Sequence, residues 1–301
     1  MNAAASLSPI GIWIHGARPQ TLVLSLTPII VGVAYSFAVF HHVDIVPVLA
    51  ATLSAVAIQI ATNLANDSAD GGRGADGAER LGPLRLVGAG LMSAARVRRG
   101  ALVATLVAAL AGLVVVAYGG APILAVGVAS LIAAWSYSYG PAPISASPLG
   151  EVFVILFFGV AATAGIVWLA VGAIDATALL LGVALGLPAA AVLTVNNHRD
   201  RAQDATSGRR TLAILLGARR TAFLYTAELA AATLLAGAAL WPLSRAAGVI
   251  AAGGLAVALV RGHFLAQTPI SRAMNRQLSA TVRFQIGLAL AIVGLLLSLP
   301  R

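Results

Sequence analysis

The chain has 301 residues, of which 59% are hydrophobic and only 10% charged. Water-soluble domains carry about 25% charged residues, so this composition excludes an ordinary soluble enzyme. It contains no lysine, 19 arginines and 10 acidic residues, a net charge of +9 that would suggest a nucleic-acid partner in a soluble protein. Because there is no cysteine, a disulfide framework, a thiolate metal site and a catalytic thiol are also excluded.

Long apolar runs follow one another along the chain. A membrane-spanning helix needs about 20 mostly apolar residues, and many of these runs are rich in alanine and glycine, which allow close helix packing in lipid. We therefore predict an all-α integral membrane protein, a single domain over residues 1–301 built as a bundle of about nine transmembrane helices. The predicted spans are Thr21–Phe40, Ile45–Ala65, Ala94–Tyr118, Pro122–Tyr139, Val152–Val171, Ala176–Val195, Thr221–Trp241, Ala246–Leu265 and Ala280–Leu299.

The arginines are distributed unequally between the two sides of this predicted bundle. With the N-terminus in the cytoplasm and the spans alternating, 17 of the 19 arginines are cytoplasmic, and only Arg245 and Arg301 lie on the other side. Arginine retained on the cytoplasmic side sets membrane topology. The basic charge is thus an orientation signal for a multi-pass membrane protein. We expect its location to be the plasma membrane, with the active site facing the cytoplasm. No aromatic-rich soluble module accompanies the arginines, so we expect a lipid bilayer and no nucleic acid as partner.

A first group of amide and carboxylate side chains closes the second predicted span. It contains Asn63, Asn66, Asp67 and Asp70, and Asp76 follows after a glycine-rich stretch. Asn63, Asp67 and Asp70 occupy positions i, i+4 and i+7, so a continued helix would place them on one face.

A second group closes the sixth predicted span with Asn196, Asn197, Asp200 and Asp204. Asn196, Asp200 and Asp204 occupy positions i, i+4 and i+8, again one face of a helix. The two groups are four spans apart, and an even number of crossings returns the chain to the same side. We therefore expect both groups to face the cytoplasmic side, where they can face one another.

Oxygen ligands without histidine or cysteine suit Mg²⁺, which proteins commonly hold with one or two carboxylates together with substrate phosphates. The interleaved Arg85, Arg199 and Arg209 are suited to bind the remaining phosphate oxygens, because a guanidinium group matches them in a bidentate manner. Charged residues in loops at a membrane surface are usually only solvated and paired. Two matched clusters favour a site for Mg²⁺ and a diphosphate over that simpler interpretation.

At these residues the sequence resembles the UbiA superfamily of membrane prenyltransferases, and within it the 1,4-dihydroxy-2-naphthoate polyprenyltransferases. Arg209 stands where the family commonly has lysine, and Tyr139 replaces a usual glycine. The elements that carry the resemblance are Arg18-Pro19-x-Thr21-Leu22, Asn66-Asp67-x-x-Asp70-x5-Asp76, Gly82-Pro83-Leu84-Arg85, Gly140-Pro141-x-Pro143 with Leu149-Gly150-Glu151, and Asn196-Asn197-x-Arg199-Asp200-x3-Asp204-x3-Gly208-Arg209.

The resemblance implies transfer of a polyprenyl group from its diphosphate to a dihydroxynaphthoate, with loss of carbon dioxide. It implies Asp67, Asp70, Asp200 and Asp204 as catalytic residues that hold Mg²⁺, with Asp76 as a further ligand. The residues expected to bind substrate are Asn63, Asn66, Arg85, Tyr139, Asn197, Arg199 and Arg209. The polyprenyl tail needs an apolar tunnel, for which these helices are suited.

Other interpretations remain open at this point. Within the same reaction class, the acceptor could be 4-hydroxybenzoate or homogentisate. A membrane transporter also fits nine spans, although its charges would lie near the midplane and not at one face. A Mg²⁺-dependent phosphatidyltransferase is disfavoured because its aspartates lie in one continuous run. The roles of Tyr137, Glu151 and Glu228 stay undecided.

Overall fold

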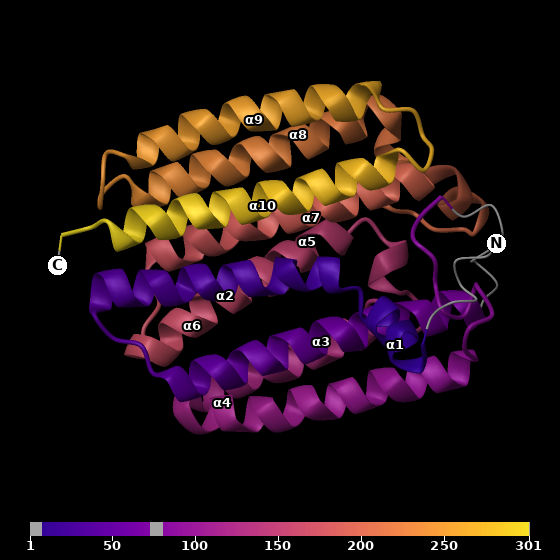
Figure 1. The fold of residues 1–301 in the computed structure, drawn as a ribbon, viewed down its shortest axis with the longest axis horizontal. Coiled ribbons are helices and arrows are strands. Elements are labelled where there is room, and N and C mark those ends of the chain that lie inside the picture. The colour runs from indigo at the N-terminus through magenta and orange to yellow at the C-terminus, as the bar shows by residue number, and fades with distance from the viewer. Residues whose placement is uncertain (1–7, 73–80, 301) are drawn as a thin grey trace.

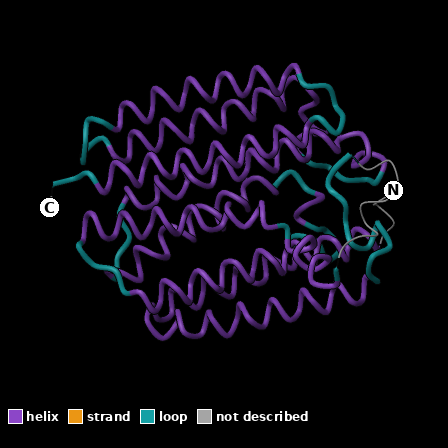
Figure 2. Tube along the Cα trace, viewed as in Figure 1, coloured by secondary structure: helices purple, strands orange, loops and turns teal. Residues whose placement is uncertain are grey.

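The computed structural model describes residues 8–72 and 81–300, and within these ranges the chain forms helices and loops without strands (Figure 2). Eight helices of this part are long and apolar enough to cross a membrane. The helices, from the N-terminus, are α1 Pro9–Ala17, α2 Pro19–Phe40, α3 Ile45–Gly72, α4 Ala94–Ser136, the 3₁₀ turn η2 Ile144–Ala146, α5 Gly150–Val154, the π-helix η3 Ile155–Ala161, α6 Ala162–Val171, α7 Ala176–Thr206, α8 Leu212–Leu240, α9 Ala247–Gln267 and α10 Met274–Leu297.

Helix α4 consists of two membrane-spanning segments. Its 43 residues would extend about 64 Å as one helix, about twice the thickness of a bilayer core. At Gly120 the backbone leaves the helical conformation, with φ of 67°, and Trp135 Nε1 donates a hydrogen bond to Thr105 Oγ1 at 3.1 Å. Residues equally far on either side of Gly120 are thus in contact, so the chain reverses there. The prediction of a membrane-spanning bundle of about nine helices is confirmed.

The long helices run side by side, and α1 and the final turn of α10 lie at opposite ends of the bundle (Figure 1). Helix α7 occupies the centre, where Leu181 and Leu185 pack with Tyr35 of α2, Leu240 of α8 and Ile292 of α10. Helices α3 and α4 pair with one another along the other side of the bundle. The described arginines, except Arg245, lie at or near the end of the bundle where α2 begins.

Two helices continue beyond the apolar runs at this arginine-rich end. Helix α3 extends to Gly72 and α7 to Thr206, so both aspartate clusters lie on the last turns of membrane helices. The predicted spans end at Ala65 and Val195, before most of the polar residues. Hydropathy falls at those residues even though each helix continues through them.

The segment from α5 to α6 contacts α7 at unusually short range. A Cβ atom at Gly159 would lie 2.6 Å from Gly186 Cα and would collide with the carbonyl oxygen of Gly182. Small residues at such crossings let helix backbones approach closely in a membrane. The same segment is wound as the π-helix η3, an arrangement frequent at functional sites, and its Phe157 and Phe158 both face the cavity described below.

Candidate active site

A cavity of about 540 Å³ lies between the α3–α4 pair on one side and η3, α6 and α7 on the other. Along α3 its lining runs from Ala51 through Ile58 to Asp70, the last of which lies at the arginine-rich end. The far part is lined by aliphatic and aromatic side chains. The polar end is lined by Arg18, Asn63, Asn66, Asp70, Arg85, Asn196, Asn197, Asp200, Asp204 and Arg209.

Arg209 connects the two aspartate clusters. Its Nη2 lies 2.6 Å from Asp70 Oδ1 on α3, and its Nε lies 3.5 Å from Asp204 Oδ1 on α7. Burial opposes the charged form of Arg209, but the carboxylates of Asp70 and Asp204 outweigh burial and raise the pKa of its guanidinium group. The expectation that the clusters lie on the same side and face one another is confirmed.

Asp70 is the central carboxylate of the polar end and is almost fully buried. Besides Arg209, it pairs with Arg85, whose Nη1 also donates a hydrogen bond to the backbone oxygen of Asn66 at 3.2 Å. A buried carboxylate requires such partners. The pair of arginines therefore keeps Asp70 ionised and places two guanidinium groups at the polar end.

Three asparagines of the polar end donate hydrogen bonds from their side-chain nitrogens to other groups of the protein. Asn63 Nδ2 donates to Ala17 O at 2.9 Å, Asn66 Nδ2 to Ser138 Oγ at 3.2 Å, and Asn197 Nδ2 to Glu151 Oε1 at 3.0 Å. An amide side chain has one oxygen acceptor besides its nitrogen donors. Their side-chain oxygens accept no hydrogen bond from the described residues, so they are available as ligands at the polar end.

Asp67 does not line this cavity. Its Oδ2 accepts a hydrogen bond from the backbone N–H of Leu86 at 2.8 Å, and its Oδ1 accepts one from Val87 at 3.0 Å. Helix α3 continues through all three residues as predicted, but only Asn63 and Asp70 line the cavity. The predicted role of Asp67 as a Mg²⁺ ligand stays a prediction. Asp67 lies at the edge of the cavity-lining face of α3, and its carboxylate instead accepts hydrogen bonds from the backbone that follows Arg85. Asp67 thus holds the loop that presents Arg85, and Asn66 occupies the cavity wall.

Arg199 also lies outside the cavity lining, although the sequence predicts that it binds substrate. Its Nε and Nη2 donate to the two carboxylate oxygens of Asp200 at 2.8 and 2.6 Å, and its Nη1 donates to Asn275 Oδ1 at 2.7 Å. Nη2 also pairs with Asn196 Oδ1. All three nitrogens of the guanidinium group thus have partners within the protein, and these contacts orient Asp200 and Asn196. Substrate binding by Arg199 stays a prediction.

Replacing Arg199 by lysine is expected to keep the charge but remove the forked contact with Asp200 and the link to Asn275. Loss of such a supporting contact typically costs 10- to 100-fold in metal affinity or activity, so we expect the Mg²⁺ concentration needed for half-maximal turnover to rise by about that factor. A Mg²⁺ titration of the purified variant measures this. Arg210→Lys is the matched control, because Arg210 is exposed. An unchanged Mg²⁺ requirement in Arg199→Lys would contradict the positioning role.

Tyr139, predicted to bind substrate, is likewise turned away from the cavity. Its hydroxyl lies 2.6 Å from Ser68 Oγ, and its ring packs against Trp135 at a centroid distance of 5.4 Å. Tyr137 lines the cavity in its place. Burial, and next the Glu151 carboxylate, raise the pKa of Tyr137, so its hydroxyl stays protonated. Asp76 lies outside the described residues.

The structure adds residues whose place at the site was not predicted. Arg18 joins α1 to α2 with φ of 54°, an uncommon conformation for a residue with a side chain, and it lines the polar end. Gln59 and Ser25 line the cavity deeper within the membrane. Gln59 interrupts the apolar stretch Ala55–Ala61. This interruption was the feature of the sequence that could have indicated a functional role for Gln59. Glu228 is buried, does not line the cavity, and accepts a hydrogen bond from Thr194 at 3.1 Å.

The sequence matches the UbiA prenyltransferase family over residues 25–286, a range that includes both aspartate clusters and most of the cavity wall. The chain belongs to the UbiA prenyltransferase family. It is an integral membrane prenyltransferase, and the residues at the polar end of the cavity are the candidates for its active site.

Two bacterial relatives of this UbiA-family chain carry the same name. The protein from Mycobacterium tuberculosis called 1,4-dihydroxy-2-naphthoate octaprenyltransferase is 36% identical over 223 residues, which cover 74% of this chain and 76% of that protein. The Escherichia coli protein of the same name is 35% identical over 211 residues, 68% of each chain. A relative from Danio rerio, UbiA prenyltransferase domain-containing protein 1, is 29% identical.

Solved structures share the fold of this chain. The UbiA homologue of Archaeoglobus fulgidus bound to DMAPP and Mg²⁺ superposes with a TM-score of 0.68 at 16% identity, covering 95% of this chain and 99% of that one. The same homologue bound to GPP and Mg²⁺ gives a TM-score of 0.64.

Proposed function

We propose that this protein transfers a polyprenyl group from polyprenyl diphosphate to 1,4-dihydroxy-2-naphthoate in a Mg²⁺-dependent reaction, with loss of carbon dioxide, to give demethylmenaquinone. The observation that carries the proposal is a cavity with two facing asparagine and aspartate clusters at its polar end and an apolar remainder. This arrangement suits a substrate with a diphosphate head and a hydrocarbon tail.

The donor set of the polar end fits Mg²⁺. Within the described part of the chain, no three Asp, Glu, His or Cys side chains form a complete protein metal site. Mg²⁺ is usually held by one or two carboxylates together with substrate phosphates, and Asp70, Asp200 and Asp204, with oxygens of Asn66 and Asn197, provide such an incomplete set. Bound there, the ion would neutralise the negative charge of the leaving diphosphate.

The charges of the polar end support this assignment. Among the described residues, three carboxylates and the three guanidinium groups of Arg18, Arg85 and Arg209 line it, so the formal charges of these six groups cancel. A multiply charged diphosphate would meet three carboxylates there, and a divalent cation removes that repulsion. Arg85 and Arg209 can bind phosphate oxygens in a bidentate manner, which orients the bond to be broken.

The rest of the cavity serves the hydrocarbon chain. Its lining includes Ile123, Leu124 and Leu131 from the second half of α4, opposite Phe157 and Ala161. Ligand sites of this kind are mostly apolar with a few placed polar groups. The hydrocarbon tail would thus exclude water from the place where the allylic carbon loses its diphosphate, which limits capture of the cation by water.

The names of the relatives support the naphthoate acceptor. Transfer to another aromatic acceptor, 4-hydroxybenzoate or homogentisate, is the alternative within the same chemistry. The distribution of arginines supports a plasma-membrane protein whose active site faces the cytoplasm, since arginine is retained on that side. Transport as the sole function is disfavoured because the charged side chains gather at one end of the bundle.

The test is an assay of detergent-purified protein with a polyprenyl diphosphate, each candidate acceptor and Mg²⁺, with the product identified by mass. We expect prenylated, decarboxylated naphthoate to form, turnover to fall to background after EDTA treatment, and Mg²⁺ to restore it. Preferred prenylation of 4-hydroxybenzoate would reassign the acceptor. Failure to release diphosphate with any acceptor would refute the proposed reaction.

A further inference from the structure

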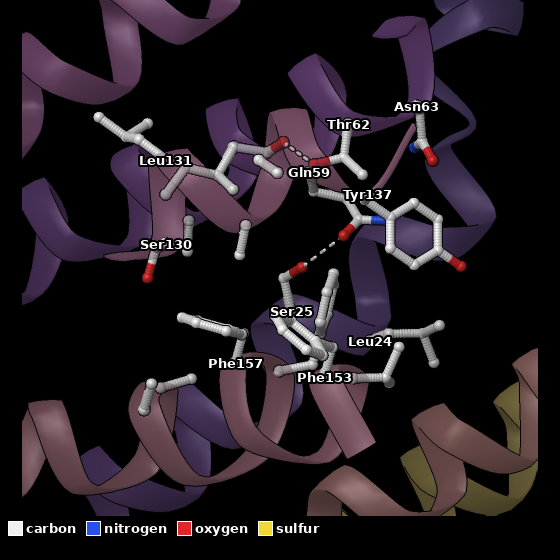
Figure 3. Close-up of a pocket in the computed structure, with 18 of the residues that line it drawn as sticks. Leu24, Ser25, Gln59, Thr62, Asn63, Ser130, Leu131, Tyr137, Phe153 and Phe157 are labelled. Carbon is white, nitrogen blue, oxygen red and sulfur yellow. Dashed lines mark hydrogen bonds between the residues drawn. The ribbon is translucent and has the colours of Figure 1, made fainter. Parts of the chain in front are cut away.

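An uncharged polar pair lies inside the cavity, below the charged residues of the polar end. Ser25 of α2 donates a hydrogen bond to Gln59 Oε1 of α3 at 3.4 Å (Figure 3). Gln59 Nε2 in turn donates to Thr21 Oγ1 at 3.3 Å. Both Ser25 and Gln59 are buried by protein, yet both line the cavity. We call Ser25 and Gln59 the Gln59 pair.

Polar side chains are costly within membrane helices and are usually retained for a function. Helix packing alone explains the Gln59 pair poorly, because both hydrogen bonds lie near the long limit for such bonds. Asn63, one turn along α3, reaches the same Thr21 oxygen at 3.1 Å and the backbone of Ala17 at 2.9 Å. Asn63 therefore already ties α3 to the beginning of α2, which leaves Gln59 available for another partner.

The depth of Gln59 places it between the sites proposed for the diphosphate and the tail. It lies four residues before Asn63 on α3, about 6 Å deeper in the bundle. Beyond it the α3 wall continues with Ile58, Ala55 and Ala51. The reacting carbon of a prenyl diphosphate is the first carbon of the tail, so it lies at this junction. A second substrate must bring its own reacting carbon within contact distance of that carbon.

The side chains around this junction suit a flat aromatic ring. Phe153 and Phe157 stack with a centroid distance of 5.9 Å and, with Tyr137, surround the same part of the cavity as the Gln59 pair (Figure 3). Aromatic rings favour stacked or edge-to-face contacts with one another. An aromatic ring held there would have hydrogen-bonding groups on one side and aromatic surface on the other.

Resting on the proposed function, we propose that the Gln59 pair binds a ring hydroxyl of the aromatic acceptor and so orients the ring against the first carbon of the prenyl chain. A primary amide can accept a hydrogen bond at its oxygen and donate another from its nitrogen, so Gln59 matches a phenolic hydroxyl in both roles. The site thus selects hydroxylated aromatic acceptors and contributes nothing to recognition of the diphosphate.

The experiment compares wild-type protein with Gln59→Leu, which keeps the side-chain size and removes both hydrogen-bonding groups. We expect the KM for 1,4-dihydroxy-2-naphthoate to rise about three- to tenfold, the loss of one neutral hydrogen bond, with an unchanged KM for the polyprenyl diphosphate. Two analogues that each lack one hydroxyl, 1-hydroxy- and 4-hydroxy-2-naphthoate, are measured as competitive inhibitors, so that their lower reactivity has no influence. Wild type should discriminate against one analogue, and Gln59→Leu should lose that discrimination.

Two further variants keep the inference falsifiable. Thr52→Ala is the matched control, because Thr52 also lies on α3 but does not line the cavity, and its hydroxyl donates to Val48 O at 2.7 Å. This variant should leave both KM values unchanged. Ser25→Ala decides the question if Gln59→Leu does not fold, and should raise the acceptor KM about two- to threefold.

Equal effects on both substrates, or retained discrimination between the analogues, would overturn the inference while leaving the proposed function intact. Absence of prenyl transfer by the wild-type protein to any aromatic acceptor would instead refute the proposed function itself.

Discussion

Asp70→Asn is expected to lower prenyl transfer about a thousandfold at saturating Mg²⁺. Asp70 lies where α3, Arg85 and Arg209 meet at the polar end of the cavity, and the variant loses one of the carboxylates proposed to hold Mg²⁺. Metal stabilisation of a leaving group is worth several kcal/mol, and about 1.4 kcal/mol corresponds to a tenfold change in rate. Turnover of the purified variant in the assay described above measures the loss.

Asp67→Asn is the matched control for that experiment, because it makes the same substitution three residues away on the same helix. The carboxylate of Asp67 accepts two backbone hydrogen bonds from Leu86 and Val87. An amide oxygen can replace only part of that contact, so we expect a lower midpoint of thermal unfolding and a turnover loss of about tenfold or less. A larger turnover loss in Asp67→Asn than in Asp70→Asn would contradict the placement of the site.

Gly159→Ala is expected to destabilise the bundle by much more than its single methyl group suggests. The added Cβ would lie 2.6 Å from Gly186 Cα and would collide with Gly182 O, both of which are backbone atoms of α7 that cannot rotate away. Overpacking of this kind costs about 1–3 kcal/mol, which for a chain of this length corresponds to a fall of about 2–5 °C in the midpoint of thermal unfolding. Unfolding of detergent-purified protein, followed by circular dichroism, measures it.

Gly165→Ala provides the comparison, since it makes the same change in α6, the helix that continues the segment containing Gly159. Apart from the nearby backbone of its own helix, no atom of the described residues lies within 4 Å of the new Cβ at that position. Alanine is favoured over glycine in a helix by up to about 1 kcal/mol, so Gly165→Ala should be neutral or slightly stabilising. Equal destabilisation by the two variants would show that the close crossing of η3 and α7 does not determine stability.

Much of the fold was predictable because the membrane imposes a strong constraint on sequence. Backbone groups in lipid must be paired within the chain, so long apolar runs can only be helices. Even the reversal inside α4 was visible, because the runs Ala94–Tyr118 and Pro122–Tyr139 are separated at Gly119 and Gly120. The two clusters of the polar end were also predictable. The helical spacing of their polar residues placed each cluster on one helix face, and the even number of membrane crossings between them placed both at the same end of the bundle.

The roles of individual polar residues were not predictable in the same way. Asp67 and Asp70 differ little in helical phase, and Arg199 and Arg209 are both arginines of the second cluster. Their positions in the structure differ because they have different hydrogen-bond partners, some of which come from distant segments of the chain. The backbone at Leu86 and Val87 takes Asp67 out of the cavity, and Asn275 of α10 helps to hold Arg199 in the protein interior.

The sequence by itself thus determined the membrane class, the order of the spans and the family, because hydropathy and motif spacing are local properties of the chain. The sidedness stays a prediction from the distribution of arginines. Only the tertiary structure decided which polar groups face the cavity. A buried donor or acceptor must find a partner. The partners of Asp67, Tyr139 and Gln59, and the Asn275 partner of Arg199, belong to parts of the chain that are distant in sequence.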